Sequence, residues 1–253
     1  MMKPSMNDAS RSPLRARLMA RVAASHATEA GMVTTRRRNA PRESLAAGVT
    51  AQTLYRGTGQ RPGEPLRVRL IELAAGTWLD AAMLGGDATL SARHREWLVL
   101  AGRVNSAHGD FGALDYHATP AGLATPRWQA PEAAWLFLRE SAALATPGSA
   151  PLSVRDAEAG WPHFAPGIRR RVLWQDDGQA ALLYAADPGA AVPRHTHGHD
   201  EECLMVQGEL FLDDVLLQSG DYQLAPSGTG HRLTQTDTGV VIYAHGDLDL
   251  HFF

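Results

Sequence analysis

Short apolar runs recur along the chain from Thr53 onward, and Gly, Pro, Asp and Asn residues separate them. Many short strands with turn signals between them are typical of a sandwich or a barrel. The pattern therefore predicts an all-β fold. The predicted strands are Leu66–Leu73, Glu96–Leu100, Trp135–Leu138, Arg170–Trp174, Ala180–Tyr184, Glu202–Val206, Val215–Leu217 and Gly239–Ala244.

The N-terminal segment has a helical pattern instead. Ser12 and Pro13 are typical of an N-cap and a first helical residue, and Gly31 suits a helix end. An apolar stripe flanked by arginines follows at helical spacing; it consists of Leu14, Leu18, Met19 and Val22. We predict one amphipathic helix over residues 13–29 and a loop over Arg36–Arg38.

The chain also contains an internal repeat with a constant offset of 106 residues. The matching segments are Glu96–Gly102 with Glu202–Gly208, Asp115-Tyr116 with Asp221-Tyr222, and Pro120–Gly122 with Pro226–Gly228. Several matches in one register indicate two copies of one β-fold. We predict a basic helical arm over residues 1–48, a first copy over 49–145, a linker over Ala142–Pro151 and a second copy over 150–253.

Charge is distributed unevenly between the arm and the rest of the chain. Residues 1–43 carry nine Lys or Arg and three acids, so this segment is +6 and the remainder is −9 of a net −3. A basic arm can contact nucleic acid or an acidic protein, but a solvated helix face is the favoured interpretation. No run is apolar and long enough for a membrane helix or a signal peptide, and the single Cys fits a reducing, cytoplasmic compartment.

The second copy contains three histidines and a glutamate at a spacing that suits metal ligation. His195 and His197 lie two residues apart, so they project from the same face of a strand. Gly198 allows a bend that returns Glu201 to the same centre, and a hairpin after Gly220 brings in His231. Buried imidazoles and a carboxylate each need a partner, which one divalent cation supplies. The other interpretation is an unmetallated barrel that binds a sugar or an acid.

Mixed nitrogen and oxygen ligation does not select one metal. Zn²⁺, Fe²⁺, Mn²⁺, Ni²⁺ and Cu²⁺ all suit such a site. Four protein ligands complete a tetrahedral zinc site. The same four ligands leave two open positions on an octahedral iron.

In the first copy, the constant offset places Thr89, Ser91, Arg95 and Thr125 at the four ligand positions. None of these side chains is a good ligand for a transition metal, and the Arg95 guanidinium would repel a cation. We therefore predict a metal-free first copy that serves packing or small-molecule binding. The histidines of this copy are expected at the surface; they are His94, His108 and His117.

Other chemically capable residues lie near the predicted ligands. His199 is expected to face solvent, with a fifth ligand or a proton carrier as the alternatives. Cys203 shares strand parity with Glu201 and is expected to be a buried structural thiol near the metal rather than a redox sensor. Tyr222, Tyr243 and His245 are candidates to line the pocket or to lie in the core.

The complete spacing resembles the paired motifs of the cupin superfamily, except that Gln235 replaces a final Asn. The run from His195 to Gly208 and the lead-in from Trp161 to Trp174 further resemble the ChrR-like cupins. The resemblance implies two tandem cupin barrels, the first degenerate, behind an N-terminal helix. It also implies that His195, His197, Glu201 and His231 hold a metal ion, for which zinc is favoured.

In the ChrR-like family, the cupin is attached to regulators of sigma factors and senses an oxidative signal. The family's zinc-binding anti-sigma domain uses a Cys-x-x-Cys motif, which this sequence lacks. Our first hypothesis is therefore a regulatory or sensory protein that responds to a small molecule or an oxidant, with a regulator such as a sigma factor as its partner. The alternative is an Fe²⁺-dependent dioxygenase. The resemblance also implies a homodimer, and we expect no binding to nucleic acid or membranes.

Overall fold

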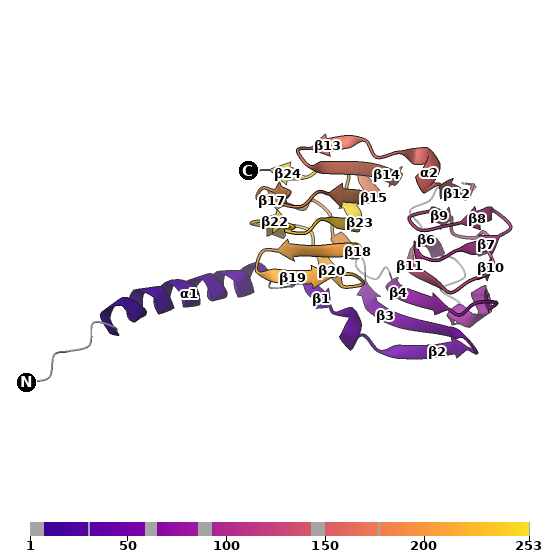
Figure 1. Cartoon of the computed structure of the whole chain (residues 1–253), viewed down its shortest axis with the longest axis horizontal. Helices are drawn as coiled ribbons and strands as arrows, with labels where there is room; N and C mark the ends of the chain where they lie inside the picture. Colours follow the sequence, from indigo (N-terminus) through magenta and orange to yellow (C-terminus); the bar gives the residue numbers. More distant parts are fainter. Residues whose placement is uncertain are drawn as a thin grey trace, which may run out of the picture.

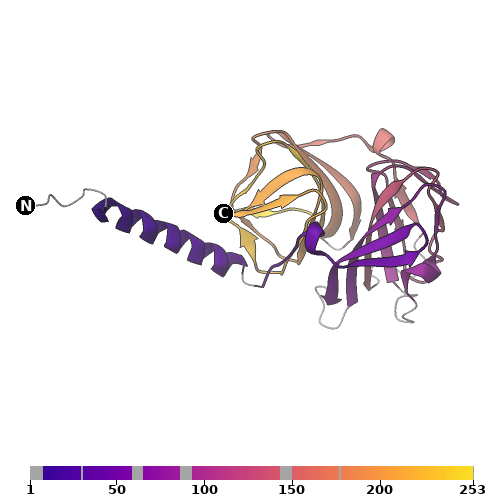
Figure 2. The same ribbon diagram turned by 60° about the horizontal axis from the view of Figure 1, so that its bottom comes forward.

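Two β-barrels lie side by side, and a long helix projects away from the second one (Figure 1, Figure 2). The computed structural model describes residues 8–29, 31–58, 65–85, 93–142, 150–176 and 178–252. The predicted all-β fold with two tandem barrels behind an N-terminal helix is confirmed. Most of the predicted linker, and with it residues 143–149, lies outside the described residues.

The first barrel consists of a seven-stranded sheet and a four-stranded sheet. The seven-stranded sheet has the order β12 (Leu152–Val154), β9 (Tyr116–Thr119), β6 (Arg93–Ala101), β11 (Ala134–Ala142), β4 (Pro65–Leu73), β3 (Val49–Thr58) and β2 (Arg42–Ala46). The four-stranded sheet has the order β5 (Trp78–Leu79), β10 (Trp128–Gln129), β7 (Val104–Ser106) and β8 (Gly109–Phe111). A short 3-10 helix, η2 (Ala81–Leu84), follows β5.

The second barrel repeats this plan. Its large sheet follows the order β1 (Val33–Thr35), β20 (Tyr222–Ala225), β18 (Glu201–Leu212), β23 (Val240–Asp247), β15 (Gln179–Ala186), β14 (Ile168–Asp176) and β13 (His163–Ala165). The strands β16 (Ala191–Val192), β19 (Val215–Gln218) and β22 (Thr234–Gln235) extend this sheet. A separate three-stranded sheet consists of β21 (Gly230–His231), β17 (His195–Thr196) and β24 (His251–Phe252). A short helix, α2 (Asp156–Ala159), precedes β13.

The backbone confirms the internal repeat that the sequence indicates. Gly102 and Gly208 occupy equivalent positions and have nearly identical φ angles of 74° and 75°. A Cβ atom at Gly102 would lie 2.1 Å from the carbonyl oxygen of Ala133, and one at Gly208 would lie 2.1 Å from that of Gly239. A side chain is excluded at both positions, so the shared glycine marks the same turn in both copies.

The two barrels exchange edge strands. The large sheet of each barrel ends in a strand from the chain segment that directly precedes the other barrel. β1 precedes the first barrel but pairs with β20 of the second. β12 precedes the second barrel but pairs with β9 of the first. The described structure therefore extends the first sheet beyond the expected 49–145 range at both ends, to β2 and to β12.

Strand parity separates the interior of each barrel from the interface between the barrels. On β6, Trp97 and Val99 belong to the core of the first barrel, whereas Leu98 and Leu100 belong to the interface core. On β18, Cys203 and Met205 face the second barrel's interior. The alternation is the one a strand requires when both of its faces are buried.

A buried ion-pair network joins the barrels at this interface. Arg139 donates to Glu96 of the first barrel (Nη1–Oε1, 2.9 Å) and to Glu202 of the second (Nε–Oε1, 2.8 Å). The Tyr116 hydroxyl donates to Glu96 at 2.7 Å, and its repeat equivalent Tyr222 donates to Glu202 at 2.9 Å. The network thus satisfies two buried carboxylates with one guanidinium and a pair of related hydroxyls.

Tyr243 and His245, which the sequence analysis named as candidates to line the pocket or lie in the core, belong to this ion-pair network. The Tyr243 hydroxyl donates to Glu96 at 2.8 Å, and His245 Nε2 lies 3.7 Å from Oε1 of the same carboxylate. Burial raises the pKa of Glu96, but Arg139, His245 and His94 lower it more, to about 2. Burial, together with Arg139, lowers the pKa of His245 to about 4.

Two histidines that were expected at the surface are buried, so that prediction is wrong for them. His94 is 2% exposed and packs against Trp174, with 5.4 Å between ring centroids. His117 is 1% exposed and packs against Phe111 and Trp128. Both strands are covered on their two faces, which a single-sequence pattern does not reveal for a polar residue. His108 is exposed, as predicted.

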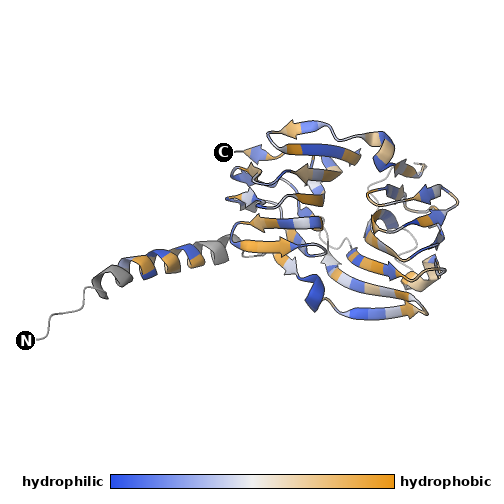
Figure 3. Ribbon diagram, viewed as in Figure 1, coloured by the Kyte–Doolittle hydropathy of each residue, from blue (hydrophilic) through white to orange (hydrophobic). Residues whose placement is uncertain are grey.

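The N-terminal helix α1 spans Asp8–Glu29 and contains Pro13, so it begins five residues before the predicted start. It projects away from the barrels in both views, and hydrophobic bands are visible on it (Figure 3). The predicted apolar stripe is exposed: Leu14 57%, Leu18 53%, Met19 60% and Val22 46%. Arg21 pairs with Asp214 of the second barrel. The Arg36–Arg38 run, predicted as a loop, enters the 3-10 helix η1 (Arg37–Asn39).

Among the described helices, none has both the length and the apolar character that crossing a membrane requires.

The network predicts a large effect of removing its guanidinium. Arg139→Met leaves two buried carboxylates without their cation, and we expect it to lower the free energy of unfolding by about 3–5 kcal/mol. The triple variant Glu96→Gln, Arg139→Met, Glu202→Gln should recover much of this loss. Arg103→Met, at an exposed position, serves as the control and should stay within about 0.5 kcal/mol of the parent chain in urea unfolding.

The interface also predicts acid sensitivity. Glu96 has a pKa of about 2, below its ordinary 4.5, and His245 has one of about 4, below 6.5, so the unfolded chain binds protons more readily at both groups. The stability that these two groups contribute is therefore fully present above about pH 6.5, and it declines as the pH falls through 4 toward 2. Urea midpoints between pH 8 and pH 4 measure this decline. It should be shallower for His245→Gln and unchanged for the exposed His163→Gln.

Candidate metal centre

The four predicted ligand residues come from two short strands, from the start of the long strand β18 and from the bend that precedes it. His195 lies on β17, and His197 follows directly after that strand. Glu201 is the first residue of β18, and His231 is the last residue of β21. β17 pairs with β21 so that His195 lies opposite His231. This pairing, rather than sequence proximity, brings the distant histidine to the others.

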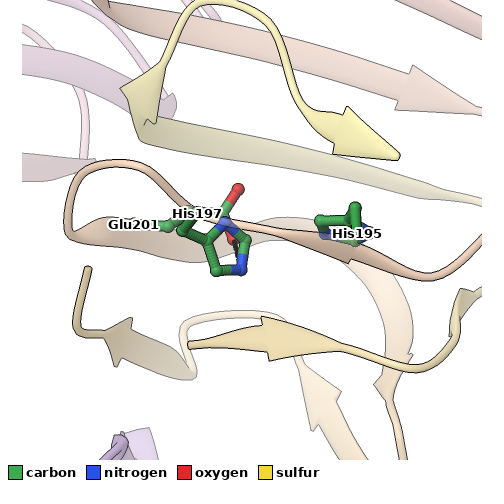
Figure 4. A group of neighbouring side chains, drawn as sticks. All are labelled: His195, His197 and Glu201. Atoms are coloured by element: carbon green, nitrogen blue, oxygen red, sulfur yellow. Dashed lines mark ion pairs between the residues drawn. The ribbon is translucent and has the colours of Figure 1, made fainter. Parts of the chain in front are cut away.

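The side chains converge. Ligand atoms of His195, His197 and Glu201 lie within 4.8 Å of one another (Figure 4). The His197 Nε2 atom is 3.2 Å from Glu201 Oε2, and His231 Nε2 is 3.9 Å from the same oxygen. The ring centroids of the three histidines are 5.2–5.6 Å apart. Among the described residues, His195, His197 and Glu201 form the group of three or more side chains that could hold a metal ion, and His231 lies next to this group.

The protonation states suit metal binding. Burial lowers the pKa of His195, and it lowers that of His197 to about 4, where the neighbouring His231 adds to the effect. Both rings are therefore neutral at pH 7 and offer lone pairs. Burial raises the pKa of Glu201, while His231 and His195 lower it by less.

Unpartnered atoms test whether these residues fit a metal ion. Within the described structure, neither ring nitrogen of His197 or of His231 has a hydrogen-bond partner, although both rings are only 2% exposed. Buried imidazoles without partners are costly in a folded protein. A cation at the centre of the group would satisfy one nitrogen of each ring, so the residues fit the ion that the spacing predicts. Their assignment as ligands stays a prediction.

Two groups outside the predicted ligands orient the histidine rings: the Pro193 carbonyl and the Asp213 carboxylate. No sequence pattern indicated Asp213. The Pro193 carbonyl lies 2.9 Å from His195 Nδ1, which leaves Nε2 for the centre. Asp213 Oδ2 lies 3.7 Å from His231 Nδ1, an ion-pair distance. Asp213 sits in the β18–β19 turn with a φ of 55°, and its Oδ1 accepts from the Arg232 backbone N–H at 2.8 Å. Such outer contacts fix ring orientation at metal sites.

A second carboxylate, Asp247, holds the bend between the ligands. It accepts from the Gly198 backbone N–H and also pairs with His199 Nδ1. The His199 side chain is 36% exposed, which agrees with the expected solvent-facing position. His199 is therefore a positioning contact of the bend rather than a member of the central group. Sequence reasoning missed Asp247 because it lies at the end of β23, 46 residues after Glu201.

A mostly apolar cavity of about 70 Å³ adjoins the central group. It has room for a few water molecules or a ligand of a few heavy atoms. Its lining includes Ile168, Leu210, Leu212, Val240 and Ile242, together with His195, Glu201 and His231.

Cys203 also lines this cavity, as its strand parity predicted. Burial, with a smaller contribution from Glu201, raises the pKa of its thiol well above the ordinary value. The thiol therefore stays protonated at neutral pH, which is the behaviour of a structural cysteine.

In the first barrel, Thr89 and Ser91 lie outside the described residues. Arg95 and Thr125, at the positions of Glu201 and His231, contact each other directly: Arg95 Nη1 donates to Thr125 Oγ1 at 2.6 Å. A fixed positive charge thus occupies the position of a ligand carboxylate.

Comparison with known proteins gives one family match. Residues 149–249 match the family model described as the ChrR Cupin-like domain. No curated protein matches the chain.

Solved structures are similar over both barrels. A candidate dioxygenase from Nostoc punctiforme is 14% identical, with 86% of this chain and 83% of that one covered and a TM-score of 0.60. A variant of Bacillus subtilis oxalate decarboxylase is 18% identical, with 87% and 78% covered and a TM-score of 0.59. The formate complex of Lactobacillus farciminis oxalate decarboxylase is 14% identical, with 87% of each chain covered and a TM-score of 0.60. Similarity at these identities establishes the fold.

The geometry predicts different outcomes for two neighbouring histidines. His197→Ala removes a central nitrogen and should weaken metal binding by more than about 100-fold, since even an outer contact is worth 10–100-fold. His199→Ala, the matched control, should retain the ion with a loss below about tenfold. Titration of metal-free protein with Zn²⁺ measures both, and equal losses would contradict the separation of the two roles.

Proposed function

Residues 149–249 form a ChrR Cupin-like domain, and from this we propose that the chain is a metal-binding regulatory protein. Its second barrel holds one divalent cation, with zinc favoured, and senses a small molecule or an oxidant. The observation that carries the proposal is the convergence of three buried imidazoles and one carboxylate, two of the rings having no hydrogen-bond partner among the described residues.

The ligand set suits zinc. Three imidazoles and a carboxylate can complete a tetrahedral zinc site. When bound, the ion supplies a Lewis-acidic centre next to the cavity. The chain's own residues hold the rings in place, exclude bulk water with an apolar wall and keep the nearby thiol protonated. A small neutral molecule that enters this cavity is the signal that best suits its size and lining.

A dioxygenase is the second candidate, and the apolar cavity beside the ligands favours it. Four ligands on an octahedral iron would leave two positions open toward that cavity. Against it, the described cavity lining holds only two ionisable side chains besides the ligand residues, Tyr184 and Cys203. Burial raises the pKa of Tyr184 to about 12, so neither group is suited to move a proton at neutral pH.

The helix α1 is the proposed contact with the regulatory partner. Its stripe of exposed apolar side chains has no cover among the described residues, and Arg15 and Arg17 flank it. A helix of this kind suits an apolar groove with an acidic rim. We assign that groove to a regulator such as a sigma factor. The homodimer is proposed through the outer edge of β13, which ends the second barrel's sheet; light scattering of the purified chain tests it.

Metal content separates the two functions. Protein purified anaerobically, after expression without added metal, should contain one equivalent of zinc per chain. Stoichiometric iron would instead support the dioxygenase. Two equivalents per chain would contradict the assignment of the first barrel as metal-free.

A second prediction concerns the partner contact of helix α1. Leu18→Glu places a charge on the apolar stripe and should reduce capture of the regulatory partner by at least about tenfold in a pull-down. Ala20→Glu, on the opposite face of the same helix, is the matched control and should bind like the parent chain. Equal capture by both variants, or no regulator among the captured proteins, would count against this contact.

A further inference from the structure

A larger pocket, of about 700 Å³, lies where the chain crosses from the second barrel to the first. β1 pairs with the second barrel and β2 pairs with the first, and the turn η1 lies between them (Figure 1). The volume falls within the range of small-molecule sites. Four arginines line this pocket, which we call the arginine pocket: Arg36, Arg37, Arg38 and Arg42.

The arginine pocket has more positive than negative groups. Two carboxylates pair with three of its arginines: Asp221 with Arg36, and Glu72 with Arg37 and Arg42. Arg38 is half-buried and has neither an ion pair nor a hydrogen bond among the described residues. Four guanidiniums thus share two carboxylates, and one guanidinium is left for a ligand.

The internal repeat provides an equivalent turn for comparison. β12 pairs with β9 in the register in which β1 pairs with β20, so α2 follows β12 as η1 follows β1. Both turns are anchored in the same way. Asp221 Oδ1 accepts from the Arg37 backbone N–H at 2.9 Å, and the equivalent Asp115 Oδ1 accepts from the Asp156 backbone N–H at 2.7 Å. Because the anchor uses a backbone N–H, it does not depend on the Arg37 side chain.

The side chains of the two turns differ in charge. Residues Arg36–Asn39 carry three guanidiniums, whereas the equivalent residues Arg155–Glu158 carry one guanidinium and two carboxylates. Ala157 stands at the position of Arg38. The turn therefore forms without a cation at this position. A guanidinium that the fold does not require, in a pocket with more guanidiniums than carboxylates, indicates an anion site.

A buried acceptor of the same pocket has no donor. Gln52, on β3, is 8% exposed and lines the pocket. Its Nε2 donates to the carbonyls of Arg37 at 3.1 Å and Ala40 at 3.4 Å, so the amide lies against the turn that carries Arg38. Within the described structure, the Gln52 Oε1 atom has no hydrogen-bond partner. Since the two carbonyls fix the orientation of the amide, a ligand that meets this oxygen must supply an O–H or an N–H.

We propose that the arginine pocket binds a small phosphate monoester that carries hydroxyl groups, such as a sugar phosphate. A phosphate monoester has a charge of about −1.5 to −2 at pH 7, which balances the guanidiniums that the two carboxylates leave over. The guanidinium of Arg38 pairs with phosphate oxygens, whose geometry its N–H groups match. A hydroxyl of the ligand donates to Gln52 Oε1. This site is independent of the metal centre and of the function proposed for it.

The test uses the full chain after chelation of metal, so that an ion in the second barrel contributes no phosphate binding. Calorimetric titrations at low ionic strength compare ribose 5-phosphate with pentyl phosphate, which has the same number of carbons and no hydroxyl. Ribose 5-phosphate should bind at one site per chain. Pentyl phosphate should bind about fivefold more weakly, the effect of one hydrogen bond between uncharged groups. Added salt should weaken both, because the main contact is between charges.

Arg38→Ala is the most informative variant, because the equivalent turn has Ala157 at this position. The urea midpoint should equal that of the parent chain, since Arg38 has no partner among the described residues. Affinity for ribose 5-phosphate should fall about 10–100-fold, the effect of a hydrogen bond between charged groups. Arg103→Ala, at an exposed position outside the pocket, is the matched control and should bind like the parent chain.

Three results would overturn the proposal. The first is the absence of heat and of thermal stabilisation with ribose 5-phosphate at 10 mM, roughly the weakest affinity of interest. The second is binding that survives Arg38→Ala unchanged; its loss in His197→Ala would then place the phosphate in the second barrel. The third is equal affinity for pentyl phosphate and ribose 5-phosphate, which would exclude the hydroxyl contact and with it the proposed ligand class.

Discussion

A charge inside a β-barrel must meet an opposite charge, and this requirement organises the whole molecule. The second barrel gathers imidazoles and a carboxylate that fit a cation, and the first barrel surrounds one carboxylate with guanidiniums. Between the barrels, Arg139 serves a carboxylate from each side. The three arrangements share one physical cause, which is that desolvated charges are tolerated only in compensated groups.

The two copies show how one scaffold supports opposite chemistry. The turn at Gly102 and Gly208 and the hydroxyl contacts of Tyr116 and Tyr222 are the same in both. These features belong to the backbone path and to the shared interface, which both barrels need. The inward positions near the strand ends are free to differ, because the apolar cores at the other ends hold each barrel together. The chemistry of the two copies therefore differs at the positions that contribute least to core packing.

Most of the fold could be predicted from the sequence, since eight apolar runs and a constant offset identify eight strands and two copies. The convergence of the four candidate ligands followed from the parity of His195 and His197 and from the glycine-marked hairpin. The remaining elements depended on tertiary pairing. β1 and β12 carry no strong strand pattern and are strands because a distant edge accepts them. Asp213 and Asp247 contact the candidate centre through loops whose approach no local spacing encodes.

The exchanged strands have a consequence for dissecting this protein. Because β1 completes the second barrel and β12 completes the first, neither half is a closed unit along the chain. A fragment starting at residue 150 would expose the backbone donors and acceptors of β20 and leave β12 without a neighbour. An open edge of this kind invites pairing between molecules. Metal chemistry studied on such a fragment would therefore report on an aggregation-prone species, and both barrels are whole only in a unit that runs from β1 to β24.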